Sequence, residues 1–188
     1  LLAASGRLHD RIGGPSVFPP QPESVLALAY GNEKWQISSG PDRYRRSLYT
    51  YSKRTAPFAA VAVFDAPSGE ACVARRDRST TPLQSLTLLN DAMYLEFARG
   101  LADDVLAASP SDPETAATVI FRRLLTRPPA QHEVEALVAF YVRQLDRARV
   151  GELSAEAICD NPSATAEQAA WTLVARAVMN LEETITRP

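Results

Sequence analysis

Apolar residues recur at helical spacing through most of the chain from residue 82 onward. Residues three, four and seven positions apart share one face of an α-helix, so each such stripe predicts a helix with one buried side. The first stripe consists of Leu86, Leu89, Met93, Phe97, Leu101 and Val105. Together with capping and loop signals, the stripes predict helices at roughly 81–107, 113–126, 131–150, 154–158 and 163–184.

The start of the first of these helices carries the strongest local signal in the chain. Thr81 fits the N-cap position, Pro82 the first helical position, and Gln84 the third, where its side chain can close a capping box. We therefore expect an ordered helix start at this point.

The first 80 residues are less periodic and contain many loop signals. Residues 1–8 resemble the end of a helix, and a turn with an extended proline-rich loop follows at 12–22. Val17 and Phe18 are expected to pin this loop to the body of the domain. Residues 35–37 fit either a short strand or a buried aromatic anchor.

A further helix is predicted over roughly 43–54, capped by Asp42. Its apolar stripe would consist of Tyr44, Leu48 and Tyr51. A second line of side chains on this segment is basic and contains a tyrosine: Arg45, Tyr49 and Lys53, with Arg46 alongside. This face is either a solvated surface on which arginine stems lie against tyrosine rings, or a recognition face for anions or sugars.

Residues 58–64 form a continuous apolar run, too short to distinguish a buried strand from a buried helix, although its alanines favour a helix. Asp65 follows directly, so we expect a partly buried carboxylate that needs a partner. Asn90 lies four residues after Leu86, next to the apolar stripe, and is predicted to be a buried, hydrogen-bonded amide.

The composition fits one globular, mainly α-helical domain. The chain has 188 residues, of which 46% are hydrophobic and 22% charged. We predict a single helical-bundle-like domain with a long irregular Arg-rich segment and a Pro-rich N-terminal loop. Within it, 1–42 would be the loop-rich beginning, 43–90 the Arg-rich signature segment and 82–188 the bundle. Because the first residues read as a truncated helix, we interpret the chain as the C-terminal fragment of a longer protein.

Charge is distributed unevenly along the chain. Residues 43–78 contain eight Lys/Arg and three Asp/Glu, a formal +5, whereas the whole chain carries −2. The near-neutral total argues against nucleic acid or a membrane surface as partner, and no apolar stretch reaches the roughly 20 residues that span a bilayer.

The basic residues of this segment converge on the helix start at Thr81, where the helix dipole already places positive charge. Carboxylates of the same segment could balance them, namely Asp65, Glu70 and Asp77; alternatively, an external anion could bind there. The candidate ligand-binding residues are Arg45, Arg46, Tyr49, Lys53, Arg54, Arg75, Arg76, Arg78 and Thr81.

Other chemistry finds little support in the sequence. Two histidines and two cysteines, Cys72 and Cys159, are too few for a multi-histidine or cysteine-rich metal site, and we expect no metal and no cofactor in this chain. The two cysteines could pair, or could be separate thiols. No glycine-rich phosphate loop and no nucleophile motif is present.

Several separated motifs resemble one family. They are Gly13-Gly14-Pro15-Ser16-Val17, Arg45-Arg46-Ser47-Leu48-Tyr49, Phe64-Asp65-Ala66-Pro67-Ser68, Arg75-Arg76, Thr81-Pro82-Leu83-Gln84-Ser85-Leu86 and Asn180-Leu181-Glu182-Glu183. In this order they resemble the C-terminal domain of unknown function of large planctomycete proteins, some of which carry a cytochrome-c-like domain and a second uncharacterised domain. The resemblance implies a secreted, periplasmic or cell-surface protein, and would assign haem to the cytochrome-like domain.

These observations favour a non-catalytic module that binds or docks an anionic ligand, for which acidic or sulfated polysaccharide is a plausible class. Two alternatives stay open. The domain could be a structural scaffold packing on further N-terminal domains of the same protein, or part of an enzyme site shared with them.

Overall fold

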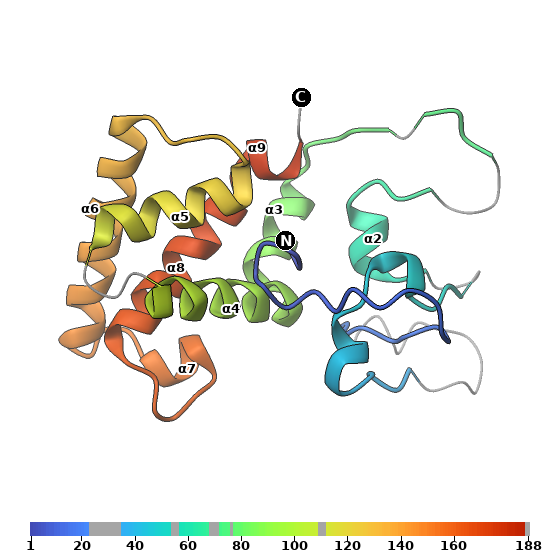
Figure 1. Ribbon diagram of the computed structural model, residues 1–188, viewed down its shortest axis with the longest axis horizontal. Helices are drawn as coiled ribbons and strands as arrows, with labels where there is room; N and C mark the ends of the chain where they lie inside the picture. The colour runs from blue at the N-terminus through green and yellow to red at the C-terminus, as the bar shows by residue number, and fades with distance from the viewer. Residues whose placement is uncertain (23–34, 54–56, 68–71, 76, 109–111, 187–188) are drawn as a thin grey trace. The chain divides into compact units, whose positions relative to one another are not determined.

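The computed structural model describes residues 1–22, 35–53, 57–67, 72–75, 77–108 and 112–186. Within these ranges the secondary structure is helical, with no β-strand and only two isolated parallel bridges, His9 with Arg45 and Val17 with Thr50. The predicted mainly α-helical class is therefore confirmed (Figure 1).

The chain divides into two compact units. Unit 1 comprises Leu1–Gly6 and Leu95–Pro188, and unit 2 comprises Arg7–Tyr94. Unit 1 has nine Lys/Arg and fourteen Asp/Glu, a formal −5, and unit 2 has eleven and eight, a formal +3. The organisation of both units as one domain stays a prediction.

Unit 1 is built from helices packed around α8. Its helices are α4 (Ala92–Ala108, beginning in unit 2), α5 (Pro113–Leu125), α6 (Gln131–Arg149), α7 (Ala155–Cys159), α8 (Ala166–Met179) and α9 (Glu182–Ile185). Helix α8 packs against α5, α6, α7 and α9 (Figure 1). Ala170, Val174 and Val178 on α8 are completely buried, and the Trp171 ring stacks on Tyr141 of α6 at 4.1 Å between centroids.

Local capping explains why the helices of unit 1 were predictable. Asp112 accepts a hydrogen bond from the backbone N–H of Glu114 at the start of α5, and Gly151 follows α6 with φ +80°. The last predicted helix, 163–184, is longer than the observed one. Thr165 caps α8 in a capping box with Gln168, and the chain leaves the helix at Asn180 before the short α9.

The predicted helix over 81–107 is interrupted in the structure. It forms α3 (Pro82–Asn90) and α4, separated by Asp91, whose backbone is extended (φ −75°, ψ 132°). The Asp91 carboxylate accepts a hydrogen bond from the Met93 N–H at 2.8 Å, as an N-cap side chain does. The apolar spacing continues across the break, so periodicity alone did not reveal it.

Unit 2 has short helical elements and much irregular backbone. The helical elements are η1 (Gly40–Tyr44), η2 (Ser47–Tyr49), α2 (Ala59–Val63) and α3. The apolar run at 58–64 is thus helical, and α2 packs against α3. The prediction of a helix over 43–54 is wrong for the described residues of that range, and Leu48, assigned to its buried stripe, is 85% exposed. Tertiary hydrogen bonds replace those of the helix, because Val17 donates to the Tyr49 carbonyl and accepts from the Tyr51 N–H.

An aromatic cluster holds the Pro-rich loop, as expected of its apolar residues. Val17 is 2% exposed, and the Phe18 ring packs against both Trp35 and Tyr51. Trp35 also donates from Nε1 to the carbonyl of Pro19 at 2.8 Å. Trp35 is therefore an aromatic anchor and not part of a strand.

Candidate functional site

Arg45 is buried and holds the N-terminal loop of unit 2. The residue is only 3% exposed. Nη2 of its guanidinium donates to the carbonyls of Arg11 (2.8 Å) and Gly13 (2.6 Å). The other terminal nitrogen, Nη1, approaches the Pro15 carbonyl at 3.5 Å. We call Arg45, Tyr49 and residues 11–15 the arginine clamp. In the arginine clamp, the guanidinium donates hydrogen bonds to the protein's own backbone carbonyls.

Tyr49 completes the arginine clamp. Its ring centroid lies 3.8 Å from the Arg45 guanidinium carbon, and its hydroxyl accepts a hydrogen bond from the Gly13 N–H at 3.0 Å. Gly13 and Gly14 have φ of +78° and +96°, a region that side chains rarely adopt. A Cβ on Gly14 would also lie 3.4 Å from Arg45 Nη1. The Gly-Gly pair therefore lets the loop close over the arginine.

Arg46 points to a different partner. It forms an ion pair with Asp10, and the two side chains are 50% and 66% exposed. The predicted single basic face of Arg45, Arg46 and Tyr49 is thus divided into a buried clamp and an exposed ion pair. Lys53, the last described member of that line, is half-buried.

A second polar network, the Asp65 network, joins Asp65, Ser79, Thr81 and Gln84. Asp65 accepts from the Ser79 N–H at 2.8 Å and from the Ser79 hydroxyl at 2.9 Å. Asp65 is half-buried and has φ +58°, a conformation that Asp tolerates better than most side chains. The expected partly buried carboxylate is present, and Ser79 is one of its partners.

Gln84 connects this network to α2 and to the helix start. The residue is 1% exposed, and its Nε2 donates to the Val63 carbonyl (3.1 Å) and to Ser79 Oγ (3.2 Å). Its Oε1 accepts from the Thr81 N–H, while the Gln84 N–H donates to Thr81 Oγ1. The predicted capping box is confirmed. Protein oxygens therefore already occupy the N–H groups of Thr81 and Gln84.

The remaining candidate residues are distributed as follows. Arg75, Asp77 and Arg78 are exposed. Arg54, Glu70 and Arg76 lie outside the described residues. Asn90 is exposed, and its Nδ2 donates to the Leu86 carbonyl of its own helix at 2.9 Å, so the prediction of a buried amide is wrong. The side of α3 that contains Leu86 (55% exposed) and Asn90 faces outward, whereas Gln84 and Leu88 are buried.

Two polar residues of these networks were not singled out in the sequence. Ser79 binds a carboxylate 14 positions earlier, and Asp10 binds an arginine 36 positions later. Ser79 stands just before the capping box, which is the only local signal it carries. No local pattern marks Asp10.

Unit 1 contains a carboxylate–arginine clasp of Arg127, Glu133 and Glu183. Arg127 Nη2 lies 2.8 Å from Glu133, Nε lies 2.6 Å from Glu183, and the guanidinium also lies over the Phe121 ring. Hydrogen bonds from Arg127 and from the Ala130 N–H lower the pKa of Glu133 to about 2. Arg127 also lowers the pKa of Glu183. The clasp joins the turn after α5 to α6 and α9.

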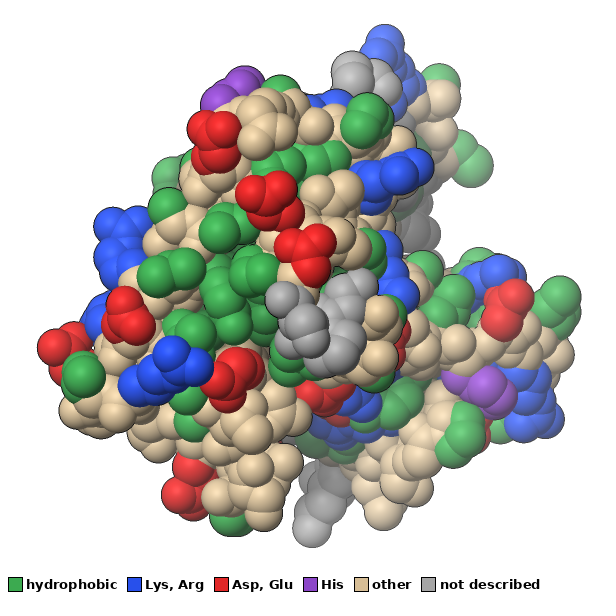
Figure 2. All heavy atoms as spheres, turned by 60° about the vertical axis from the view of Figure 1, so that its left-hand side comes forward, with side chains coloured by type: hydrophobic (Ala, Val, Ile, Leu, Met, Phe, Trp, Pro, Cys, Tyr) green, Lys and Arg blue, Asp and Glu red, His purple; other side chains and the backbone are tan. Residues whose placement is uncertain are grey.

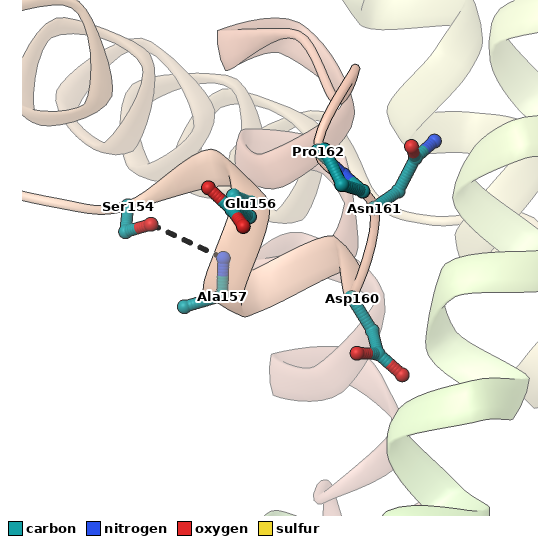
Figure 3. A pocket seen from close by; sticks show the side chains of 6 residues that line it. All are labelled: Ser154, Glu156, Ala157, Asp160, Asn161 and Pro162. Carbon is teal, nitrogen blue, oxygen red and sulfur yellow. Dashed lines mark hydrogen bonds between the residues drawn. The ribbon is translucent and has the colours of Figure 1, made fainter.

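A small polar pocket lies at the end of α7 in unit 1 (Figure 3). It has a volume of about 290 Å³ and includes two carboxylates, Glu156 and Asp160. Ser154, at its edge, caps α7 by accepting from the Ala157 N–H at 3.1 Å. Asp160 also lies 3.5 Å from Arg99. The pocket lies outside the signature segment, and the Ser154 hydroxyl that lines it is engaged in capping α7.

Charge and cysteine chemistry are unremarkable on the described surface. Figure 2 shows acidic and basic side chains interspersed with apolar ones on one face of the molecule. Among the described residues no three His, Cys, Asp or Glu are grouped as metal ligands would be. Cys72 and Cys159 are both free thiols. None of the described helices has both the length and the apolar character to cross a membrane.

Comparison with known proteins gives a family but no described activity. A family model with the description "Protein of unknown function (DUF1553)" matches residues 1–141. The match includes the arginine clamp and the Asp65 network and ends within α6, so the similar stretch at 180–183 lies beyond it. Searches of curated proteins and of solved structures gave no match. The chain belongs to the family of proteins of unknown function DUF1553.

Proposed function

We propose that this chain is a non-catalytic docking module whose signature segment, 43–90, builds the binding surface of unit 2. The observation that carries the proposal is that buried Arg45 and half-buried Asp65 hold other parts of unit 2. Arg45 binds backbone carbonyls, and Ser79 engages both carboxylate oxygens of Asp65. A general acid or base must instead reach a proton on its substrate.

The proposed ligand is an anionic polymer, with acidic or sulfated polysaccharide as the class. Unit 2 has a formal charge of +3, and Arg75 and Arg78 are exposed near the start of α3. Arg45 leaves the set of contact residues because it is buried. The proposed location outside the cytoplasm rests on the family resemblance stated above.

Binding to dextran sulfate, with neutral dextran as reference, tests this function. The Arg75→Glu/Arg78→Glu double variant should lose at least tenfold in affinity, because each reversal replaces attraction by repulsion at the polymer. Affinity of the original chain should also fall as salt rises. A matched control is Arg122→Glu/Arg143→Glu, two exposed arginines of unit 1, which should bind as the original chain does.

The structural scaffold is the second candidate, and exposed apolar residues favour it. Leu83 and Leu86 lie three positions apart on α3 and are 58% and 55% exposed. Such side chains are suited to packing on another domain of the same protein. If the folded chain binds neither dextran sulfate nor dextran, the polysaccharide proposal is overturned and the scaffold is favoured.

A further inference from the structure

Five buried polar atoms of unit 2 have no hydrogen-bond partner among the described residues. One, Gln21 Oε1, is an acceptor only, and the other four are Arg7 Nε, His9 Nδ1, Arg45 Nε and Thr50 Oγ1. The two arginine nitrogens are obligatory donors, and the histidine nitrogen and threonine hydroxyl can donate as well. A buried donor without an acceptor is destabilising, so most such groups in folded proteins are satisfied by protein, water or an ion.

Two of these residues, His9 and Arg45, lie on paired backbone segments. His9 and Arg45 form an isolated parallel bridge, in which the His9 N–H donates to the Tyr44 carbonyl at 2.9 Å. Paired residues of adjacent extended segments direct their side chains to the same side. The imidazole of His9 and the stem of Arg45 are therefore neighbours, and Arg7 precedes His9 by two residues.

The charge of Arg45 is not balanced by a described carboxylate. A guanidinium stays protonated at every relevant pH, and the residue is only 3% exposed. The terminal nitrogens of Arg45 donate to carbonyl oxygens, and its guanidinium lies over the Tyr49 ring. Arg45 forms no ion pair within the described part of the chain. The nearby Asp10 is paired with Arg46. A buried charge generally requires a counter-charge.

We propose that His9 and Arg45 form a buried binding site for one small anion of the size of chloride. Arg45 Nε and His9 Nδ1 are its donors, and the guanidinium supplies the charge. Arg7 Nε adds positive charge two residues away along the chain. Because these atoms are inaccessible to solvent, the ion must enter without its hydration shell, and a sulfated polymer cannot reach them. The site is therefore distinct from the surface of Arg75 and Arg78.

A crystal structure of the full chain grown in sodium bromide tests the site directly. Anomalous scattering should show one bromide within hydrogen-bond distance of both Arg45 Nε and His9 Nδ1. A water molecule or a protein oxygen on these two nitrogens overturns the proposal. This measurement uses the original sequence and so does not depend on a variant that folds.

Thermal unfolding gives a second test in solution. At constant ionic strength, replacing gluconate by chloride should raise the unfolding temperature with saturation, because an ion that binds only the folded state stabilises it. His9→Phe keeps an aromatic ring but removes the donor, and should lose most of this chloride response. Arg122→Gln, which removes an exposed cation of unit 1, should keep it. An equal response in the original chain and in His9→Phe overturns the proposal.

Discussion

At the scale of single residues, Arg45 and Asp65 act as long-range ties. Arg45 fixes carbonyls 30 to 34 positions earlier in the chain, and Asp65 fixes Ser79, 14 positions later. In both cases a charged side chain replaces hydrogen bonds that regular secondary structure would otherwise provide for the backbone. The irregular backbone of unit 2 is therefore held by a few specific side chains.

Replacing Asp65 tests this role. Asp65→Ala should lower the free energy of unfolding of the chain by roughly 2–3 kcal/mol, because it leaves the Ser79 donors unpaired and places alanine at positive φ. Asp65→Asn keeps an acceptor and tolerates the backbone conformation, so its loss should be smaller. Urea denaturation measures both.

Asp77→Ala is the matched control, since it removes an exposed carboxylate from the same segment. Its effect should stay within about 0.5 kcal/mol. Equal losses for the two alanine variants would contradict the structural role of Asp65.

Residue-level features were predictable where the signal is local. Thr81, Pro82 and Gln84 lie within four positions, so their capping box could be read directly from the sequence. The partners Ser79 and Asp10 could not be identified, because a hydrogen bond across 14 or 36 positions leaves no spacing rule. Asn90 was misplaced because a position next to an apolar stripe does not determine which side of the stripe is buried.

At the scale of elements, helices with capping residues and an apolar stripe were predictable. Segments in which tertiary hydrogen bonds compete with the helix were not. Helices α5 and α6 follow their predicted ranges closely. The segment 43–54 had an equally good spacing, but backbone pairing with His9 and Val17 favours extended backbone at Arg45 and Thr50. A single sequence does not show such competition between local and tertiary hydrogen bonds.

The carboxylate–arginine clasp predicts how unit 1 responds to acid. The pKa of Glu133 is lowered from 4.5 to about 2, so its contribution to stability is complete above pH 4.5 and is lost as pH falls toward 2. Glu183, whose pKa is also lowered, acts in the same direction. Between these pH values the unfolding temperature of the original chain should fall more steeply than that of Arg127→Met.

Arg123→Met provides the control for this comparison. Arg123 forms one ion pair, with Asp104 at 2.8 Å, and lacks the second carboxylate. Its pH profile should follow that of the original chain more closely. Added salt should reduce the difference between the profiles, since the clasp is partly exposed. Parallel pH profiles for the original chain and Arg127→Met would exclude the clasp as the cause of the fall in unfolding temperature in acid.

At the scale of the whole molecule, the family match and the folded unit have different boundaries. The match ends at residue 141, yet Tyr141 stacks on Trp171, and buried residues of α8 form much of the core of unit 1. The mainly helical class could be predicted because composition and periodicity report on the whole chain. The division into two units could not, since no linker-like composition separates residues 94 and 95.

Truncation tests the boundary of the folded unit. A chain ending at Tyr141 loses α8 and should not unfold cooperatively, because α5 and the remainder of α6 would expose the surfaces that α8 covers. Circular dichroism with thermal melting measures this. A chain ending at Leu181, which lacks only α9 and the last residues, should still melt cooperatively. Cooperative melting of the shorter chain would place the boundary at the end of the family match.

The arginine clamp also bears on how this family can vary. Arg45 and Tyr49 lie 32 and 36 positions after Gly13, yet both bind it, and Gly14 lies against Arg45. A larger residue at Gly14 would be strained by its φ of +96° and would lie against the Arg45 guanidinium. Arg45 without the loop would lose the carbonyls that bind it. We therefore expect these four positions to change together, and not one at a time, among related sequences.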